Sequence, residues 1–127
     1  MRSPSDKRYV LIVLICIALA LLTLAAYWPI RAFQFLNYDD PEYVTANGVV
    51  REGLTWHGLV WALTAGYASN WHPVTWLSHM LDCQIFGMNP KGPHWENVLF
   101  HIGNTLLLFG LFRRVTDSLW TAGLVAL

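Results

Sequence analysis

Residues 9–30 read YVLIVLICIALALLTLAAYWPI and contain no charged side chain. As an α-helix this stretch would extend about 33 Å at ~1.5 Å per residue, which is enough to cross the hydrocarbon core of a bilayer. Tyr27 and Trp28 lie near its far end, where aromatic residues are common in membrane spans. Basic residues precede it: Arg2, Lys7 and Arg8. We therefore predict a transmembrane helix at 9–30 that follows a cytosolic tail at 1–8.

A cleaved signal peptide is the alternative for the same stretch. The apolar part of a signal peptide is usually ~7–15 residues long, and residues 9–30 exceed that length. Leu24-Ala25-Ala26 is also an imperfect small-x-small cleavage site. A retained transmembrane helix is the favoured interpretation.

A second apolar stretch, at 93–112, ends at the pair Arg113-Arg114. Because arginine and lysine mark the cytosolic side of a span, this predicted helix returns the chain to the cytosol. A cytosolic turn at 113–118 and the start of a third span at 119–127 follow. The last segment is shorter than the ~20 residues that a span requires, so we expect the chain to be a fragment of a longer protein.

The extracytosolic loop between the two spans, residues 31–92, is predicted to contain short amphipathic helices. Asp40 before Pro41 is typical of a helix N-cap followed by proline at the first helical position, and Asn47-Gly48 supplies a stop.

Two further loop segments carry apolar side chains at helical spacing. They are 55–65, with Trp56, Leu59, Val60 and Leu63, and 73–86, with Val74, Leu77, Leu81 and Ile85. Helices with such a stripe lie in a membrane interface or pack on neighbouring spans. The fold class predicted from these patterns is an all-α polytopic membrane protein.

Composition supports that class and bears on partners. The chain is 55% hydrophobic and only 13% charged, which is too little charge for a soluble surface. Its formal net charge of +0 provides no basic field that would attract nucleic acid. Cys16 lies in the first apolar stretch and Cys83 in the loop, so we predict no disulfide between them.

The adjacent acids Asp39 and Asp40 are the first candidates for chemistry. The residue before a proline favours extended backbone, and neighbouring side chains in extended chain point in opposite directions. The two carboxylates are therefore expected to differ in role. Asp40 is explained as a helix cap, whereas Asp39 has no such local use and is a candidate general base.

Histidines form the second set of candidates. In the second span a polar stripe is formed by His94, Asn97, His101 and Asn104, which either lines a cavity or makes interhelical hydrogen bonds. In the loop, His79 and Asp82 share a helix face with Thr75, which predicts a hydrogen bond that orients the imidazole. His72 precedes Pro73 and is a candidate cap. No compact zinc-ligand spacing is present, so no metal site is assigned.

Two loop segments, NYDDPEYV at 37–44 and SNWHPVTWLSHMLD at 69–82, resemble a known family. They are similar to the N-terminal part of the transmembrane and tetratricopeptide-repeat glycosyltransferases, which are related to protein O-mannosyltransferases and have the GT-C fold. The resemblance covers nearly all of the chain after residue 33. It continues through His94, Asn97, His101, Asn104 and Thr105 to Arg113-Arg114.

The resemblance implies an enzyme that takes mannose or a similar sugar from a polyprenyl-phosphate carrier. The sugar would be transferred to a Ser or Thr hydroxyl of a protein, or to another acceptor, outside the cytosol. Asp39 would deprotonate the acceptor, and Asp40 would order the loop or assist. The lipid phosphate would lie near the stripe from His94 to Asn104. His72 and His79 are further candidates for substrate binding, and a divalent metal is compatible with the family.

The chain departs from the family pattern because the remaining spans and the tetratricopeptide repeats are absent. We therefore expect the chain to be inactive in isolation. A bacterial inner membrane is favoured over the endoplasmic reticulum because the N-terminal tail is short.

Two other hypotheses remain at this point. The first is a non-catalytic membrane scaffold whose loop helices pack on partner subunits. The second is a redox or metal protein that uses His94 and His101. Seven residues place these about 10.5 Å apart along a helix at ~1.5 Å per residue, which is too far for the two axial ligands of one haem.

Overall fold

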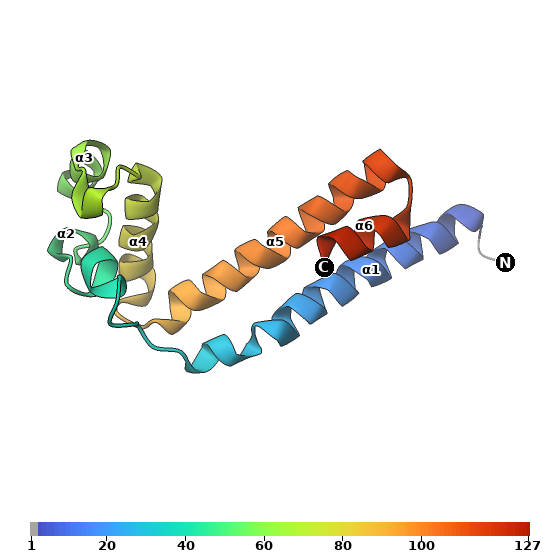
Figure 1. Cartoon of the computed structure of the whole chain (residues 1–127), viewed down its shortest axis with the longest axis horizontal. Helices are drawn as coiled ribbons and strands as arrows, with labels where there is room; N and C mark the ends of the chain where they lie inside the picture. Colours follow the sequence, from blue (N-terminus) through green and yellow to red (C-terminus); the bar gives the residue numbers. More distant parts are fainter. Residues whose placement is uncertain (1–2) are drawn as a thin grey trace. The chain divides into compact units, whose positions relative to one another are not determined.

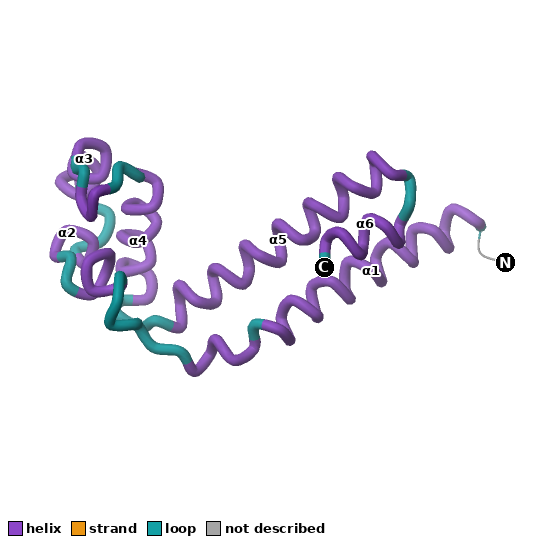
Figure 2. The backbone as a smooth tube through the Cα atoms, in the orientation of Figure 1, coloured by secondary structure: helices purple, strands orange, loops and turns teal. Residues whose placement is uncertain are grey.

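The computed structural model describes residues 3–127, and among them it contains helices, turns and loops but no strand (Figure 2). The prediction of an all-α chain is confirmed. The chain divides into two compact units. The long-helix unit joins the chain up to Arg31 with Trp95–Leu127, and the central unit is Ala32–His94.

The first long helix, α1, spans Pro4–Ala26 and is apolar and long enough to cross a membrane. It begins earlier than the predicted residue 9, because the Ser3 backbone N–H donates to the Asp6 carboxylate at 3.0 Å and Pro4 occupies the first turn. The α-helix ends before the predicted residue 30. Pro29 has no N–H for an α-helical hydrogen bond, and the chain continues as a 3₁₀ helix, η1, over Trp28–Ala32.

The second long helix, α5, spans Lys91–Thr116 and also has the length and apolarity to cross a membrane. It extends beyond the predicted 93–112 at both ends. The added C-terminal turn contains Arg113 and Arg114, whose positive charge is favourable at the negative end of the helix dipole. Asp117 then turns the chain with a positive φ of 52°, and α6 follows over Leu119–Ala126.

The three helices of the long-helix unit share one small core, and α6 packs directly on α1 (Figure 1). This core consists of Leu19 from α1, Phe109 from α5, and Ala122 and Ala126 from α6. Most other large apolar side chains of α1 are exposed, among them Leu14, Ile17, Leu21 and Leu22. The helices thus present apolar surface to their surroundings along most of their length.

The central unit is built from five short helical elements. They are the π-helix η2 (Pro41–Thr45), α2 (Gly48–Arg51), α3 (Trp56–Thr64), the 3₁₀ helix η3 (Tyr67–Ser69) and α4 (Pro73–Phe86). The predicted helix at 73–86 is confirmed, and Gly87 ends it with φ 62°. The helix that starts at Pro41 ends at Thr45, just before the predicted stop at Asn47-Gly48. The Asn47 side chain has a second role that was not predicted: it accepts from Val50 N–H at 3.2 Å and so begins α2.

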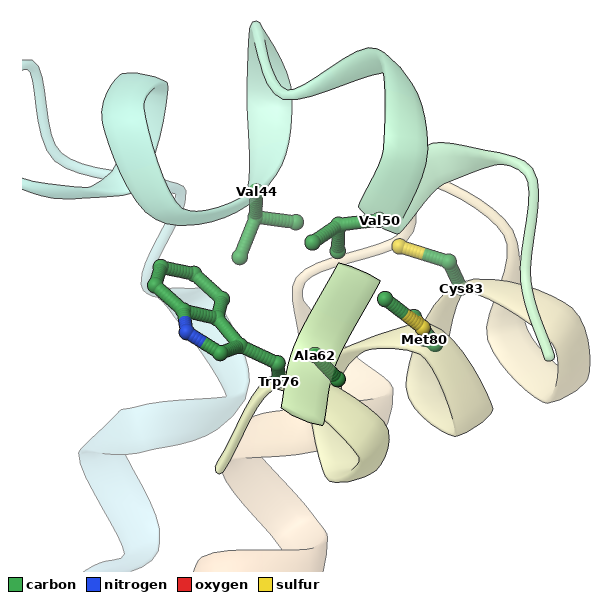
Figure 3. Packing of buried hydrophobic residues seen from close by; sticks show 6 residues of the cluster. All are labelled: Val44, Val50, Ala62, Trp76, Met80 and Cys83. Atoms are coloured by element: carbon green, nitrogen blue, oxygen red, sulfur yellow. The ribbon is translucent and has the colours of Figure 1, made fainter. Parts of the chain in front are cut away.

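The core of the central unit consists of Val44, Val50, Ala62, Trp76, Met80 and Cys83 (Figure 3). It is not formed by the predicted apolar stripes. Trp56 and Val74, the first residues of the two stripes, are each 78% exposed. The helices α3 and α4 approach through small residues, because a Cβ at Gly58 would lie 2.9 Å from the Met80 sulfur. The larger side chains on the opposite face of α3 therefore point outward.

Candidate functional site

A cluster of aromatic and imidazole rings surrounds Trp76, which is fully buried in the first half of α4. We call this set the Trp76 cluster: Tyr43, Trp61, Tyr67, His72, Trp76 and His79. Tyr43 from η2 stacks on Trp76 with ring centroids 5.0 Å apart, and His72 lies edge-on at 4.7 Å. The helix α4 positions three of the members, since His72 precedes its first turn and His79 lies one turn after Trp76.

His72 and His79 lie on the same side of this cluster, and Tyr43 contacts both rings at 5.6 and 6.3 Å. Burial lowers the pKa of His79 from its ordinary value, and the neighbouring His72 acts in the same direction. The carboxylate of Asp40 opposes that shift and therefore lies within electrostatic range of His79. A neutral imidazole near a carboxylate can accept or relay a proton.

The predicted hydrogen bond between His79 and Asp82 is not formed. His79 Nδ1 and Asp82 Oδ2 are 3.9 Å apart, which permits an ion pair when the imidazole is protonated but exceeds hydrogen-bond length. His72 does not cap α4 through its side chain either. Its ring packs on Trp76 instead, because the aromatic cluster offers more contact than the solvent-facing helix end.

Two polar atoms of the cluster are buried without a hydrogen-bond partner in the described part of the chain, namely His72 Nε2 and Trp76 Nε1. Leaving such atoms unpaired costs roughly 1–3 kcal/mol each. The interior of the cluster thus contains one imidazole nitrogen and one indole nitrogen whose hydrogen-bonding capacity is unused within the described residues.

Asp39 and Asp40 differ as expected, but for a different reason. Asp40 does not adopt the predicted extended backbone: its φ of −57° and ψ of −34° are helical. Tyr43 N–H bonds to the Asp39 carbonyl at 2.9 Å and closes a helical turn around Asp40, and the π-helix η2 follows from Pro41. The Asp40 side chain does not cap this helix. Its Oδ2 accepts from Leu36 N–H at 2.6 Å and so closes the loop that follows η1.

Asp39 is exposed, and its side chain makes no hydrogen bond or ion pair within residues 3–127. The structure thus brings Asp40, His72 and His79 together around Tyr43 and Trp76, while Asp39 stands next to this group and faces solvent. A carboxylate with these surroundings is free to meet an incoming hydroxyl group.

The polar stripe of α5 lies mostly on the surface. Asn97, His101 and Asn104 are exposed, and His101 contacts Tyr27 edge-on at 5.0 Å. His94, three residues before Asn97, is partly buried, and its Nε2 has no partner among the described residues. Because α5 is one continuous helix from Lys91 to Thr116, His94 and His101 keep the separation that excludes a shared haem.

No three His, Cys, Asp or Glu side chains in the described ranges are close enough to hold a metal ion together. Among them, His72, His79 and Asp82 lie in one segment but do not form such a group. The groups that the site presents are carboxylates, imidazoles and aromatic faces.

Sequence reasoning found the acids and histidines of this site but missed Tyr43, Trp61 and Tyr67. The i, i+3 spacing of Asp40 and Tyr43 was a usable signal, since both belong to the turn that begins η2. Trp61 and Tyr67 reach Trp76 only because α3 folds back on α4, and no local pattern encodes that contact.

No protein-family model, curated protein or solved structure matches the chain.

Proposed function

We propose that this chain is the N-terminal part of a membrane glycosyltransferase. In this proposal the enzyme takes a sugar such as mannose from a polyprenyl phosphate and transfers it to a hydroxyl group outside the cytosol, for example a protein Ser or Thr. The observation that supports it best is that two adjacent acids differ in exposure and in hydrogen bonding. Asp39 is exposed and unpaired among the described residues, whereas Asp40 is held by Leu36 N–H and lies within electrostatic range of His79.

The proposed reaction needs one carboxylate that can approach the acceptor. Asp39 removes the proton of the acceptor hydroxyl while the hydroxyl oxygen attacks the anomeric carbon of the sugar. The lipid phosphate leaves with the electrons of the broken C–O bond. Asp40 holds the loop so that Asp39 remains exposed. His72 and His79 bind polar groups of the substrate beside the aromatic faces of the Trp76 cluster, which suit the apolar faces of a sugar ring.

The membrane arrangement belongs to the same proposal. The helices α1 and α5 cross the bilayer, with the N-terminus and the Arg113-Arg114 pair in the cytosol. Asp39 then lies outside the cytosol, where a lipid-linked sugar would be presented. The helix α6 is the beginning of a third span, and a bacterial inner membrane is the favoured location.

The test is sugar transfer from a radiolabelled polyprenyl-phosphate sugar in membranes that contain the complete gene product. We expect Asp39→Asn to abolish transfer at matched protein level, since the amide cannot accept the acceptor proton. Glu42→Gln is the matched control, because Glu42 is another exposed acid three residues away. Transfer that survives Asp39→Asn would remove Asp39 as the base and with it the proposed mechanism.

A non-catalytic scaffold is the second candidate, and the outward apolar side chains of α3 and α4 favour it. Val74 is 78% exposed, and Ile85 on the same helix is also exposed. In a scaffold, Val74→Asp would prevent co-purification of a partner while Asp39→Asn would not. In the glycosyltransferase, Asp39→Asn would stop transfer without changing the set of co-purified proteins.

A further inference from the structure

Two adjoining cavities follow the contact between α1 and α6 in the long-helix unit. The first, of about 550 Å³, is lined by Lys7, Arg8, Leu11, Asp117, Ser118, Leu119 and Trp120. The second, of about 190 Å³, is lined by Ile15, Ala18, Leu19, Leu22, Leu119, Trp120, Gly123, Leu124 and Leu127. They share Leu119 and Trp120, so they form one continuous groove, which we call the α1–α6 groove.

The chemistry of the α1–α6 groove changes along its length. At the Lys7 end, two cations face one carboxylate: Arg8 donates to Asp117 at 2.9 Å, and Lys7 has no side-chain partner among the described residues. At the Leu22 end every lining residue is apolar. Trp120, which is 70% exposed, lies at the junction of the two parts. An indole at the boundary between charged and apolar surface is typical of a membrane interface.

The length of the groove matches one leaflet of a bilayer. Lys7 and Leu22 are fifteen positions apart on α1, which corresponds to about 22 Å at ~1.5 Å per residue. Half of a bilayer with its headgroups is roughly 20–22 Å thick. A groove of this length would accommodate a phospholipid with its headgroup at Lys7 and an acyl chain along Leu19 and Leu22.

We propose that the α1–α6 groove binds one anionic glycerophospholipid, with its phosphate at Lys7 and Arg8. Basic pockets beside membrane helices favour anionic over zwitterionic headgroups, because each Lys or Arg near the surface adds electrostatic attraction. The Arg8–Asp117 ion pair leaves Lys7 as the main contact for the phosphate. This inference rests on the membrane placement proposed above but not on the chemistry of Asp39.

The experiment is native mass spectrometry of the purified chain released from vesicles that contain equal amounts of phosphatidylglycerol and phosphatidylcholine. We expect one phosphatidylglycerol to be retained per chain in preference to phosphatidylcholine. Lys7→Gln with Arg8→Gln should reduce that retention about tenfold. Arg113→Gln with Arg114→Gln removes the same charge from the end of α5, which does not line this groove, and should change retention less than twofold.

Asp117→Asn separates lipid binding from a purely structural ion pair. Without the competing carboxylate Arg8 is free, so retention of phosphatidylglycerol should rise, whereas an ion pair that only holds the helices together predicts a fall. Three results would overturn the proposal. The first is an equal loss of phosphatidylglycerol retention in Lys7→Gln with Arg8→Gln and in Arg113→Gln with Arg114→Gln. The others are equal retention of phosphatidylglycerol and phosphatidylcholine, and displacement of the bound phosphatidylglycerol by an equimolar polyprenyl phosphate. A chain that does not remain with the vesicles at all would instead contradict the membrane placement of the proposed function.

Discussion

The long-helix unit and the central unit use their apolar residues in opposite ways. In α1, Leu19 and Thr23 are the buried side chains among the described residues, and the apolar remainder is largely outward. In the central unit, Val50, Trp76 and Met80 are fully buried around a shared interior. The first arrangement is stable only where the surroundings are themselves apolar. The second provides its own interior and is expected to stay folded in water-facing surroundings.

The two units also differ in how helices approach one another. In the central unit, α3 contacts α4 through Gly58 and Ala62, which leaves Trp56, Val60 and Leu63 of α3 exposed. In the long-helix unit, Ala122 and Ala126 of α6 face the larger Leu19 and Phe109. Small residues on one helix therefore mark the contact in both units.

The largest expected effect comes from removing the centre of the central unit. Trp76→Ala should destabilise this unit by about 3–5 kcal/mol, because it deletes a fully buried indole and leaves a cavity. The measurement is the urea dependence of maleimide labelling at Cys83, whose thiol is buried and has a pKa raised mainly by that burial, in a Cys16→Ala background. Trp56→Ala, at an exposed indole, is the control and should leave the midpoint almost unchanged. Equal shifts in both variants would contradict a separate core.

The close contact between α3 and α4 gives the next effect. Gly58→Leu should cost about 1–3 kcal/mol, because even its Cβ would lie 2.9 Å from Met80 Sδ and 3.2 Å from Thr55 Oγ1. Gly66→Leu is the matched control, since nothing lies within 4 Å of a Cβ at that position. Cys83 labelling measures both. If the two variants were equally stable, α3 would not approach α4 through Gly58.

The start of α2 contributes a smaller amount. Asn47→Ala should cost about 1 kcal/mol, because Asn47 is buried and its Oδ1 accepts from Val50 N–H at 3.2 Å. Asn47→Asp keeps that acceptor and should recover most of the loss. Thermal unfolding followed by circular dichroism measures the difference. A loss that is the same for both variants would place the contribution of Asn47 in its bond to the Glu42 carbonyl instead.

The smallest effect is a dependence on pH that is confined to the central unit. The pKa of His79 is lowered by burial from the ordinary value of 6.5, so the unfolded chain binds more protons than the folded chain as pH falls below 6.5. The free energy of unfolding of the central unit should therefore be at its maximum above that pH and decrease on acidification. His79→Gln should flatten the profile, and Asp40→Asn should steepen it because Asp40 favours the protonated imidazole.

Cys83 labelling between pH 7.5 and 5 under matched urea measures this dependence, with the labelling rate corrected for thiolate fraction by an unfolded standard. The control is His57→Gln, since His57 is exposed on α3. A profile that responds equally to His57→Gln and His79→Gln would show that His79 is not the titrating group.

Much of the helical structure was predictable from local signals. Thr55 and Pro73 begin α3 and α4 as predicted, and Gly87 ends α4, because caps and prolines act within one turn of the chain. The all-α class and the two long apolar helices followed from composition and hydropathy. The acids and histidines of the candidate site were also recognisable, because few residue types carry proton-transfer chemistry.

The faces of the short helices and the surroundings of each site residue were not predictable from the sequence. The apolar stripes of α3 and α4 were expected to lie in a membrane interface or to pack on neighbouring spans. Gly58 and Ala62 make the contact of α3 with α4 instead, because close packing depends on both partners. Asp40 bonds to Leu36 N–H rather than capping its helix, since the loop after η1 brings a free donor to it. Interactions within one turn of the chain, such as caps and prolines, thus determine where helices begin and end. Contacts between distant segments, which no short pattern encodes, set which side chains are buried and which remain available for chemistry.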